Sequence, residues 1–466
     1  MNLKIPLWNA VQAAYPRQAA TIIRLPIDTI LPGPKNPRIH SKRQIRQIAN
    51  SIEAFGFNAP ILIDAQRNVI AGHGRVMACQ LLGWTEVPTI ALDHLSPAQA
   101  RAYMIADNRL TDTSTWDEKL LGEHLKILSE MDLDFKLDAI GFEPAEIDLR
   151  IEQMDAGDTE ADEEIQTAAI NAVAISKLGD LWTLGDHRIL CGNALVAADY
   201  QLVMNGRKAD VVFTDPPYNV PIAGHVTGNG GVQHREFPMA CGEMSVQQFT
   251  GFLKQVFTCL IDASTDGSIH YLCMDWRHLP EILGAGAVYT ELKNVCVWAK
   301  DNAGMGSLYR SGHELVLVYK NGKAAHTNNV QLGQFGRYRT NVWKYAGVNS
   351  FARATDEGNL LALHPTVKPV ALIADALYDC SNRGQWVLDP FLGSGSTLIA
   401  AERTGRHCAG IELDPLYVDT AIRRWQRHTG LNAIHAVTGL TFEQMADQQV
   451  NHSANPAANL EESDHV

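Results

Sequence analysis

Short apolar runs that stop abruptly in polar or glycine-rich turns recur through the second half of the chain. Examples are VVFT before Asp215, WVLD before Pro390 and CAGIEL before Asp414. Segments with helical spacing, such as SVQQFTGFLKQVFTCLI and KPVALIADALYDC, lie between several of these runs. Strands that alternate with helices predict an α/β fold with a doubly wound, mainly parallel sheet. Ligands bind at the carboxyl ends of the strands in such sheets, so the turns are the expected place of a functional site.

A smaller α/β domain is predicted to precede this sheet. IIRLPIDTIL and APILIDAQRNVIAG have the pattern of strands, and KRQIRQIANSIEAFG has helical spacing and ends in Gly56, a suitable C-cap. Another helix is expected to begin with Ser96 as its N-cap and Pro97 as its first residue. The predicted organisation is an N-terminal extension (1–21), the smaller domain with a helical extension (22–151), an acidic linker (152–170), the larger domain (171–446) and a disordered tail (447–466).

Composition excludes several classes of protein. The chain has 466 residues, 46% of them hydrophobic and 20% charged, as is ordinary for a globular protein. No apolar stretch approaches the roughly 20 residues that cross a bilayer, and no basic segment followed by an apolar run begins the chain, so neither a membrane span nor a signal peptide is expected. The eight cysteines form no C-x-x-C pair, which argues against zinc and favours the reducing cytoplasm.

The net charge of −13 argues at first against a nucleic-acid partner. Binding depends on local charge, however, and residues 152–164 and the tail hold much of the acid. From Lys293 to Arg353 the balance reverses, with only Asp301 and Glu314 as acids. The basic residues there are Lys293, Lys300, Arg310, Lys320, Lys323, Arg337, Arg339, Lys344 and Arg353. This basic region is therefore the better indicator of a partner.

The glycine-rich turn in LDPFLGSGST predicts a site for an adenosine-containing cofactor. Gly393 and Gly395 permit unusual backbone angles and close approach of a ligand. The strand CAGIEL then delivers Glu412, and an acid at the end of this second strand suits a pair of ribose hydroxyl groups. The G-x-G pattern alone would equally suit a tight turn, and Glu412 favours the cofactor.

The tetrapeptide Asp215-Pro216-Pro217-Tyr218 predicts a pocket for an aromatic amino group. The prolines cannot continue a central strand. The Asp215 carboxylate and the Pro216 carbonyl are two acceptors, which suit the two N–H donors of an exocyclic amine, and Tyr218 offers a flat face for stacking. Hydrogen bonds that hold both hydrogens out of the ring plane favour a tetrahedral nitrogen, whose lone pair can attack an electrophilic methyl group. A proline turn that only caps the strand is the simpler alternative.

These motifs resemble those of S-adenosylmethionine-dependent amino-DNA methyltransferases. DPPY resembles their catalytic motif, DPFLGSGST their cofactor loop, HPTVKPVALIADAL the segment before that loop, and SGHELVLVYKNGK the strand before the recognition region. The catalytic motif comes first, which is the order of the β class, a circular permutation of the Rossmann-like sheet. The resemblance covers about residues 176–440 and implies that the two loops lie on neighbouring strand ends.

The resemblance also implies roles for single residues. Asp215, Pro216, Pro217 and Tyr218 would hold a base flipped out of double-stranded DNA. The cofactor, S-adenosyl-L-methionine, would contact Asp389, Phe391, Gly393 and Gly395 at its methionine end, Glu412 at its ribose, and Thr366 and Lys368 at its carboxylate. Asn193 stands at a further cofactor-binding position where relatives usually carry Asp, and it lacks that charge.

The resemblance favours adenine N6 as the target, because cytosine-N4 enzymes more often carry Ser in place of Asp215. Cytosine N4 remains the alternative, whereas relatives that modify RNA or protein glutamine usually carry Asn. The basic stretch 323–355 is the expected target-recognition insert, and a solvated loop is its alternative. The expected DNA contacts are Lys323, Arg337, Arg339, Lys344 and Arg353.

The smaller domain resembles the ParB N-terminal domain. Gly72, His73, Gly74 and Arg75 match its G-x-x-R box, where a glycine-rich turn at a helix N-terminus suits the phosphates of a nucleotide. The helix-turn-helix region that follows this box in partition proteins is not found in the sequence. A docking or DNA-contact module is the alternative for this domain, and a non-enzymatic partition protein is the alternative for the whole chain. The recognition sequence, a partner restriction enzyme and the oligomeric state, including a dimer, stay open.

Overall fold

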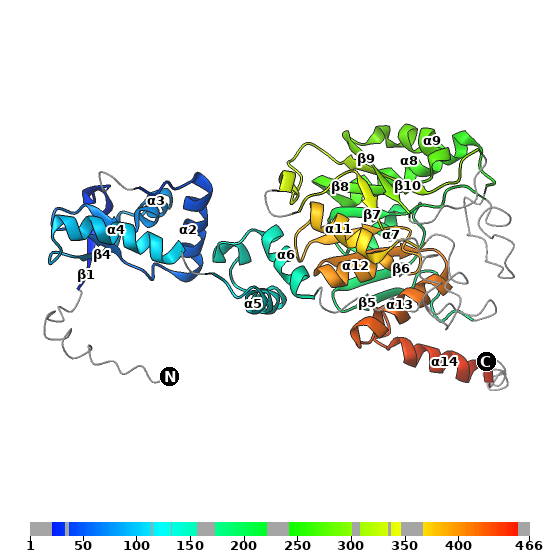
Figure 1. The fold of residues 1–466 in the computed structure, drawn as a ribbon. Helices are drawn as coiled ribbons and strands as arrows, with labels where there is room; N and C mark the ends of the chain where they lie inside the picture. Colours follow the sequence, from blue (N-terminus) through cyan, green and yellow to red (C-terminus); the bar gives the residue numbers. More distant parts are fainter. Residues whose placement is uncertain are drawn as a thin grey trace, which may run out of the picture. The chain divides into compact units, whose positions relative to one another are not determined.

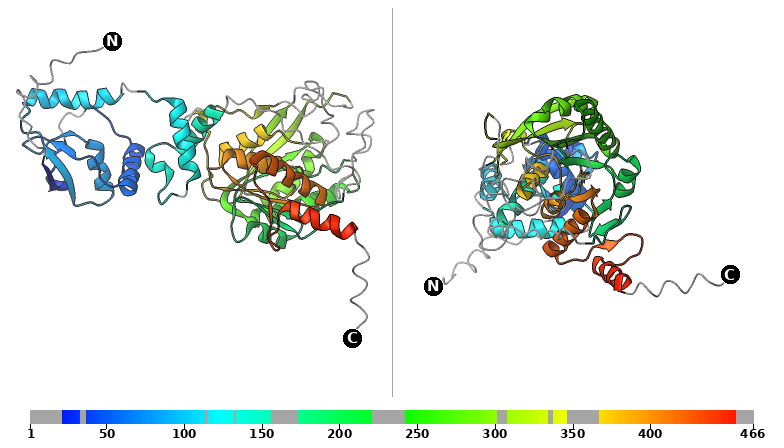
Figure 2. Two further views of the ribbon diagram at one scale, coloured as in Figure 1. Left: turned by 90° about the horizontal axis from the view of Figure 1, so that it is seen from below. Right: turned by 90° about the vertical axis from the view of Figure 1, so that its right-hand side faces the viewer.

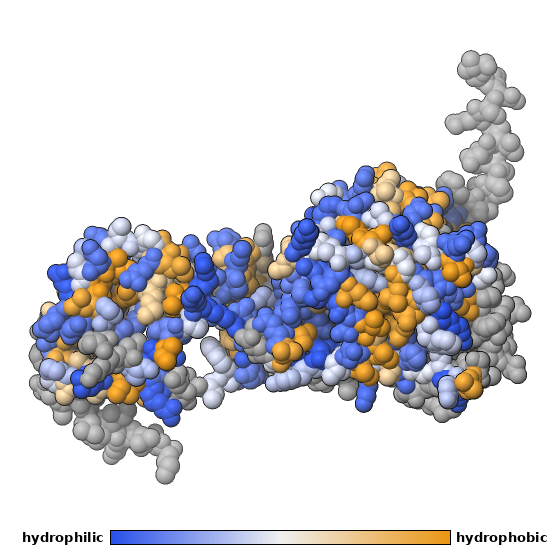
Figure 3. Space-filling view, turned by 90° about the horizontal axis from the view of Figure 1, so that it is seen from above, coloured by the Kyte–Doolittle hydropathy of each residue, from blue (hydrophilic) through white to orange (hydrophobic). Residues whose placement is uncertain are grey.

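The computed structural model describes residues 21–32, 37–112, 115–131, 133–155, 173–220, 242–300, 308–333, 337–345 and 367–454. The chain divides into two compact units, Met1–Met154 and Asp155–Val466 (Figure 1). Within the described ranges, no helix combines the length and the apolar character that crossing a membrane requires. In Figure 3, hydrophobic residues lie interspersed with hydrophilic ones on the face of each unit that is visible.

The first unit is built on a four-stranded sheet with the order β1-β4-β2-β3. Its strands are β1 (Ile22–Pro26), β2 (Ile61–Ile63), β3 (Val69–Ala71) and β4 (Glu86–Ala91), and a short 3₁₀ turn, η1 (Ile27–Thr29), follows β1. Three helices lie beside the sheet: α2 (Lys42–Phe55), α3 (His73–Leu81) and α4 (Pro97–Asp112). A buried cluster that includes Ile52, Ile61 and Val76 forms the core.

Helix ends in this unit follow the capping chemistry of the sequence. Ser41 caps α2 by accepting a hydrogen bond from the Gln44 backbone, and Gly56 ends the helix with a φ of 79°. At α4 the Ser96 hydroxyl accepts from the Gln99 backbone at 3.3 Å, while the Gln99 side chain accepts from the Ser96 backbone at 2.9 Å. This reciprocal capping box confirms the predicted start of α4.

A helical extension completes the first unit. It consists of α5 (Glu118–Glu130), the 3₁₀ turn η2 (Leu137–Ile140) and α6 (Pro144–Asp155). Leu125, Ile147 and Ile151 form its small buried core. The extension is attached to α2 by an ion pair of 2.8 Å between Arg43 Nε and Glu143 Oε1.

The second unit contains a ten-stranded sheet with the order β11-β9-β10-β8-β7-β12-β13-β6-β5-β14. The strands are β5 (Leu181–Leu184), β6 (His187–Cys191), β7 (Ala209–Thr214), β8 (Ser264–Met274), β9 (Glu291–Ala299), β10 (His313–Lys320), β11 (Val342–Lys344), β12 (Trp386–Asp389), β13 (His407–Glu412) and β14 (Ile434–His435). The central strands from β8 to β6 are all parallel, and antiparallel pairs flank them on both sides. The predicted doubly wound, mainly parallel sheet is confirmed.

Helices cover both faces of this sheet (Figure 1, Figure 2). One face carries α7 (Ala197–Met204), α8 (Val246–Ala263) and α9 (Leu279–Ala285), and the other carries α11 (Val370–Cys380), α12 (Ser396–Thr404) and α13 (Pro415–Thr429). Three 3₁₀ turns, η3 (Trp276–His278), η4 (Gly286–Val288) and η5 (Gln331–Gly333), lie in the connections. Successive side chains of β7 point to opposite faces of the sheet. Val211 and Phe213 belong to the core on one face, and Val212 belongs to the core on the other.

The C-terminal segment departs from the prediction. Helix α14 (Phe442–Ala454) occupies part of the stretch 447–466 that is predicted to be disordered. Phe442 is buried in the core beside α13, and the Gln449 side chain donates a 3.0 Å hydrogen bond to the Ala174 carbonyl. These contacts stabilise a helix that the polar sequence does not predict. Residues 455–466, the N-terminal extension up to residue 20 and most of the predicted linker lie outside the described residues.

Candidate functional site

The two predicted loops lie side by side at one edge of the large sheet. Strands β7 and β12 are parallel neighbours, with Val211 opposite Val387. At their ends the Thr214 hydroxyl donates a 2.7 Å hydrogen bond to Asp389 Oδ1, although these residues are 175 positions apart in sequence. The circular permutation predicted from the order of the motifs therefore corresponds to adjacent strand ends.

The turn after β12 is shaped by its two glycines. Gly393 has a φ of 52°, and Gly395 has a φ of 86° and is the N-cap of α12. A Cβ atom on Gly395 would lie 3.0 Å from Ala421 Cβ of α13, so a side chain there would crowd the helix packing. A Cβ atom on Gly393 would have no other described atom within 4 Å, which leaves the loop open on this side. The turn thus offers exposed backbone to a ligand.

Two acids fix this turn to the neighbouring strands. Glu412 Oε2 accepts a 2.8 Å hydrogen bond from the Gly393 backbone, and its Oε1 accepts one of 2.9 Å from Asp414. Asp389 Oδ2 accepts from the Thr397 hydroxyl at 2.6 Å. Burial raises the pKa of Glu412 to about 7 and that of Asp389 to about 6. The carboxylates are therefore placed beside the glycine turn, where the sequence predicts a cofactor.

Phe391 and Asn193 lie at the same strand ends. The Phe391 ring packs against Phe252 of α8, with 6.1 Å between the ring centroids. The Asn193 side chain accepts a 2.9 Å hydrogen bond from the Leu195 backbone and so closes a turn after β6. Asp199 Oδ2 accepts from the Asn193 backbone at 2.7 Å. A carboxylate thus stands beside this turn even though position 193 is Asn.

The predicted catalytic tetrapeptide follows β7, and both carboxylate oxygens of its aspartate accept hydrogen bonds. Tyr218 Oη donates to Asp215 Oδ1 at 2.5 Å, and Lys368 Nζ donates to Asp215 Oδ2 at 2.5 Å. Pro216 is buried and Pro217 is half-buried. Burial raises the pKa of Asp215, and the Lys368 ammonium group opposes this rise.

Asn219, which was not predicted as a site residue, secures the end of this loop. It has a φ of 54°, its side-chain nitrogen donates to the Met244 carbonyl at 2.8 Å, and its side-chain oxygen accepts from the Gly242 backbone at 3.0 Å. Asn219 thereby links the described residues on either side of segment 221–241, which lies outside the described residues. An Asn directly after DPPY, in a position that needs positive φ, was the available signal.

Lys368, predicted to reach the cofactor carboxylate, contacts the aspartate of the predicted catalytic tetrapeptide. Its ammonium group is 2.5 Å from Asp215 Oδ2 and 3.0 Å from Glu314 Oε2, and the residue is 5% exposed. Glu314 in turn pairs with Lys300 at 2.5 Å, and its Oε2 lies 3.1 Å from Tyr218 Oη. We call these five residues, Asp215, Tyr218, Lys300, Glu314 and Lys368, the Lys368 cluster. Glu314 and Lys300 were not predicted, although a lone acid at the start of an apolar strand in a basic region was a signal.

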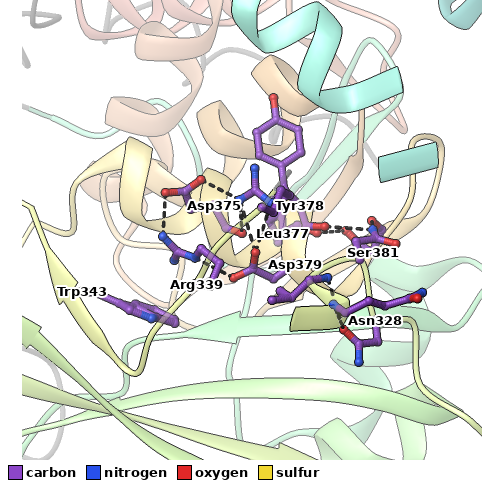
Figure 4. Close-up of polar contacts among 12 residues, drawn as sticks. Asn328, Arg339, Trp343, Asp375, Leu377, Tyr378, Asp379 and Ser381 are labelled. Carbon is purple, nitrogen blue, oxygen red and sulfur yellow. Dashed lines mark hydrogen bonds and ion pairs between the residues drawn. The ribbon is translucent and has the colours of Figure 1, made fainter. Parts of the chain in front are cut away.

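The predicted DNA contacts Arg337 and Arg339 form ion pairs within the protein. Arg337 is 7% exposed and pairs with Asp375 at 2.8 Å. Arg339 lies 3.0 Å from Asp375 Oδ2 and 3.0 Å from Asp379 Oδ2, and in Figure 4 it points toward both carboxylates of α11. The two arginines are thus neutralised inside the protein, and they attach the predicted insert to α11.

The other predicted DNA contacts divide between the two edges of the sheet. The Lys323 backbone donates to Asp266 at the beginning of β8, whereas Asp215 follows the end of the parallel strand β7, so Lys323 lies at the opposite edge. Lys344 ends β11 opposite Ala299, which also pairs with His313 beside Glu314. The Lys344 side chain is exposed, at the same edge of the sheet as Asp215. Arg353 and Thr366 lie outside the described residues.

The ParB-like box forms the turn between β3 and α3. Gly72 caps α3 with a φ of 102°, and the Arg75 guanidinium donates to the Ala59 carbonyl at 2.8 Å. A Cβ on Gly74 would come within 2.8 Å of the Ile48 side chain. His73 is buried, its Nε2 has no hydrogen-bond partner among the described residues, and burial lowers its pKa, with the charge of His40 adding to the effect. In the described part of the chain, no group of His, Cys, Asp and Glu is arranged to hold a metal ion.

Comparison with known proteins gives two matching families. The DNA methylase family of the N6/N4 type matches residues 209–423, and the ParB N-terminal domain matches residues 11–108. The ParB-like nuclease domain-containing protein YnaK of Escherichia coli (strain K12) is 42% identical over 78 residues, which are 17% of this chain and 90% of YnaK. The type II methyltransferase M2.MboI of Moraxella bovis is 24% identical over 249 residues, 50% of this chain and 85% of that protein.

Solved structures of DNA methyltransferases align with part of the chain. A putative DNA modification methylase from Thermus thermophilus, solved with S-adenosyl-L-methionine, aligns with a TM-score of 0.36 and 20% identity, covering 55% of this chain and 96% of that one. The cytosine-N4-specific PvuII DNA methyltransferase aligns with a TM-score of 0.41 and 14% identity, covering 60% of this chain and 97% of that one.

Proposed function

Because the chain belongs to the N6/N4-type DNA methylases and carries a ParB-like N-terminal domain, we propose that it methylates the N6 amino group of adenine in DNA, with S-adenosyl-L-methionine as methyl donor. The observation that carries this proposal is the hydrogen bond between Thr214 and Asp389, which places the DPPY motif and the glycine turn at one sheet edge. A base held by the first loop would therefore lie next to a cofactor held by the second.

The residues at the glycine turn fit this cofactor. Each oxygen of Glu412 accepts one backbone hydrogen bond, and a carboxylate oxygen has a second lone-pair site, so capacity remains for the ribose hydroxyls. The open side of Gly393 gives room for close approach. When bound, S-adenosyl-L-methionine supplies an electrophilic methyl group.

The chain's own part in the reaction is to hold and orient the base. Asp215 accepts a hydrogen bond from the amino group, and the Pro216 carbonyl offers a second acceptor, so that the nitrogen lone pair leaves the ring plane. Tyr218 lies beside Asp215 and fixes its carboxylate. The target base must leave the duplex to reach this pocket.

Adenine is the proposed base, and cytosine is the alternative, because both offer an exocyclic amine to the same two acceptors. Asp at position 215, rather than Ser, supports adenine through the resemblance. The test is to incubate the protein with DNA and cofactor, digest the DNA to nucleosides and separate them by mass spectrometry. N6-methyldeoxyadenosine is expected; N4-methyldeoxycytidine alone would select the alternative, and no methylated nucleoside would contradict methyl transfer.

For the first unit we propose a phosphate-bearing ligand such as a nucleotide at the turn from Gly72 to Arg75. The positive φ of Gly72 at the start of α3 and the Nε2 of buried His73, which has no partner among the described residues, support this role. Titration of the protein with ribonucleoside triphosphates, with Gly72→Val as control, tests it. Binding that survives the Gly72→Val substitution would place the ligand elsewhere.

A further inference from the structure

The Lys368 cluster gathers charged groups from separate elements around the proposed catalytic aspartate. Asp215 and Tyr218 follow β7, Glu314 lies in β10, Lys300 follows β9 and Lys368 precedes α11. Lys368 and Glu314 are 5% and 7% exposed. The cluster contains two carboxylates and two ammonium groups, so its charges balance. Such balance matters because a buried charge without a partner is costly.

Each oxygen of Asp215 already has one donor within the protein. Tyr218 Oη holds Oδ1 and Lys368 Nζ holds Oδ2, both at 2.5 Å. Two contacts from different directions fix the plane of the carboxylate. Each oxygen keeps a second lone-pair site, so the amino group of a base can still donate to Asp215.

Glu314 holds Lys368 in turn. Its Oε2 lies 3.0 Å from Lys368 Nζ, and its Oε1 lies 2.5 Å from Lys300 Nζ. Lys300 also lies over the Trp298 ring, 4.5 Å from the centroid, which limits its own freedom. Movement of Lys368 toward a cofactor carboxylate would separate it from buried Glu314 and half-buried Asp215 at once.

We propose, on the basis of the proposed methyl transfer, that Lys368 and Glu314 are positioning residues for Asp215, and that Lys368 does not bind the cofactor carboxylate. Lys368 fixes the aspartate and keeps it ionised as an acceptor. Glu314 fixes the lysine. The assignment of Lys368 to the cofactor carboxylate rests on the resemblance alone.

The electrostatic consequence has a definite sign for each residue. The titratable groups that face Asp215 are Lys368, Glu314, Tyr218, Cys273 of β8 and Asp389 of β12. Besides burial, which raises the pKa of Asp215, Lys368 lowers it and Glu314 raises it. Removal of Lys368 should therefore raise that pKa, and removal of the Glu314 charge should lower it.

The test compares wild type with Lys368→Met and Glu314→Gln, and uses exposed Lys254→Met on α8 as the matched lysine control. Methyl transfer is measured as kcat against pH, and cofactor affinity is measured by calorimetry. For Lys368→Met we expect kcat to fall by about 10²-fold, as for other misplaced catalytic groups, with unchanged cofactor affinity. The acid limb of the profile of kcat against pH should move to higher pH in Lys368→Met and to lower pH in Glu314→Gln. In Lys254→Met this limb should not move.

A fall in cofactor affinity for Lys368→Met, or an acid limb that does not move, would overturn the proposal. Direct titration of the Asp215 carboxyl by NMR, assigned with Asp215→Asn, gives a second readout that does not need activity. An Asp215 pKa that rises in Lys368→Met supports positioning even if methyl transfer itself is absent. If Lys368→Met fails to fold, the opposite shift in Glu314→Gln decides the question.

Discussion

Thr214 and Asp389, the last residues of the neighbouring strands β7 and β12, share a hydrogen bond of 2.7 Å between hydroxyl and carboxylate. This contact joins the strand end that carries DPPY to the one that carries the glycine turn. Because Asp389 also accepts from Thr397 at the start of α12, one buried carboxylate sets the relative position of both loops. Substitutions beside the glycine turn and substitutions beside DPPY should therefore have separate effects, according to the loop in which each residue lies.

Cofactor binding should depend on pH through Glu412. Burial raises the pKa of Glu412 to about 7, so the carboxyl is protonated below this pH and loses its charge as an acceptor for the ribose hydroxyls. Affinity for S-adenosyl-L-methionine should therefore fall as the pH drops through about 7, which calorimetry can measure. Glu412→Gln should lower the affinity at high pH by about 1.5–3 kcal/mol and remove this dependence. A wild-type affinity that stays flat across this range would place the ribose contact elsewhere.

Arg337 should matter for stability and not for DNA binding. Arg337→Gln removes a buried cation that faces Asp375 and Asp379, and such a loss costs on the order of 3 kcal/mol. Chemical denaturation should show this loss, while DNA affinity measured well below the transition should stay the same. A variant that unfolds like wild type but binds DNA weakly would restore the original DNA-contact role.

Lys344 should show the opposite behaviour. The Lys344 side chain is exposed at the edge of the sheet where Asp215 lies, so its removal leaves no buried charge without a partner. Lys344→Gln should weaken binding to all DNA sequences alike and lower the slope of affinity against salt by about 1. Its stability should match wild type. A change in the methylated sequence, instead of the overall affinity, would mean that Lys344 reads a base edge.

The sequence predicted the fold well where local rules decide the structure. Helix α2 lies between Ser41 and Gly56 as capping chemistry requires, and the apolar runs became the central strands. The resemblance to β-class methyltransferases, and no local rule, predicted that the ends of β7 and β12 are neighbours. The helix ends and the strands depend on spacing along the chain and on the general rules of parallel sheets.

Features that depend on distant partners were missed. Arg337 contacts Asp379, 42 residues later in the chain, and nothing local distinguishes this arginine from one that faces DNA. The role of Glu314 was hidden because its partners Lys300 and Lys368 come from two other elements. Helix α14 was missed because Phe442, its main buried residue, precedes a polar sequence.

Methyl transfer by Asp215→Ala, compared with wild type, tests the central claim most directly. Both proteins are incubated with DNA and S-adenosyl-L-methionine labelled in the methyl group, and the label in DNA is followed over time. Wild type should label adenine N6. The rate of methyl transfer by the variant should be lower by about 10²–10³-fold, the effect of removing one polar contact to the reacting group. The variant should keep its cofactor affinity, because Asp215 is proposed to contact the base. Transfer by Asp215→Ala at the wild-type rate would contradict the assignment of the catalytic site.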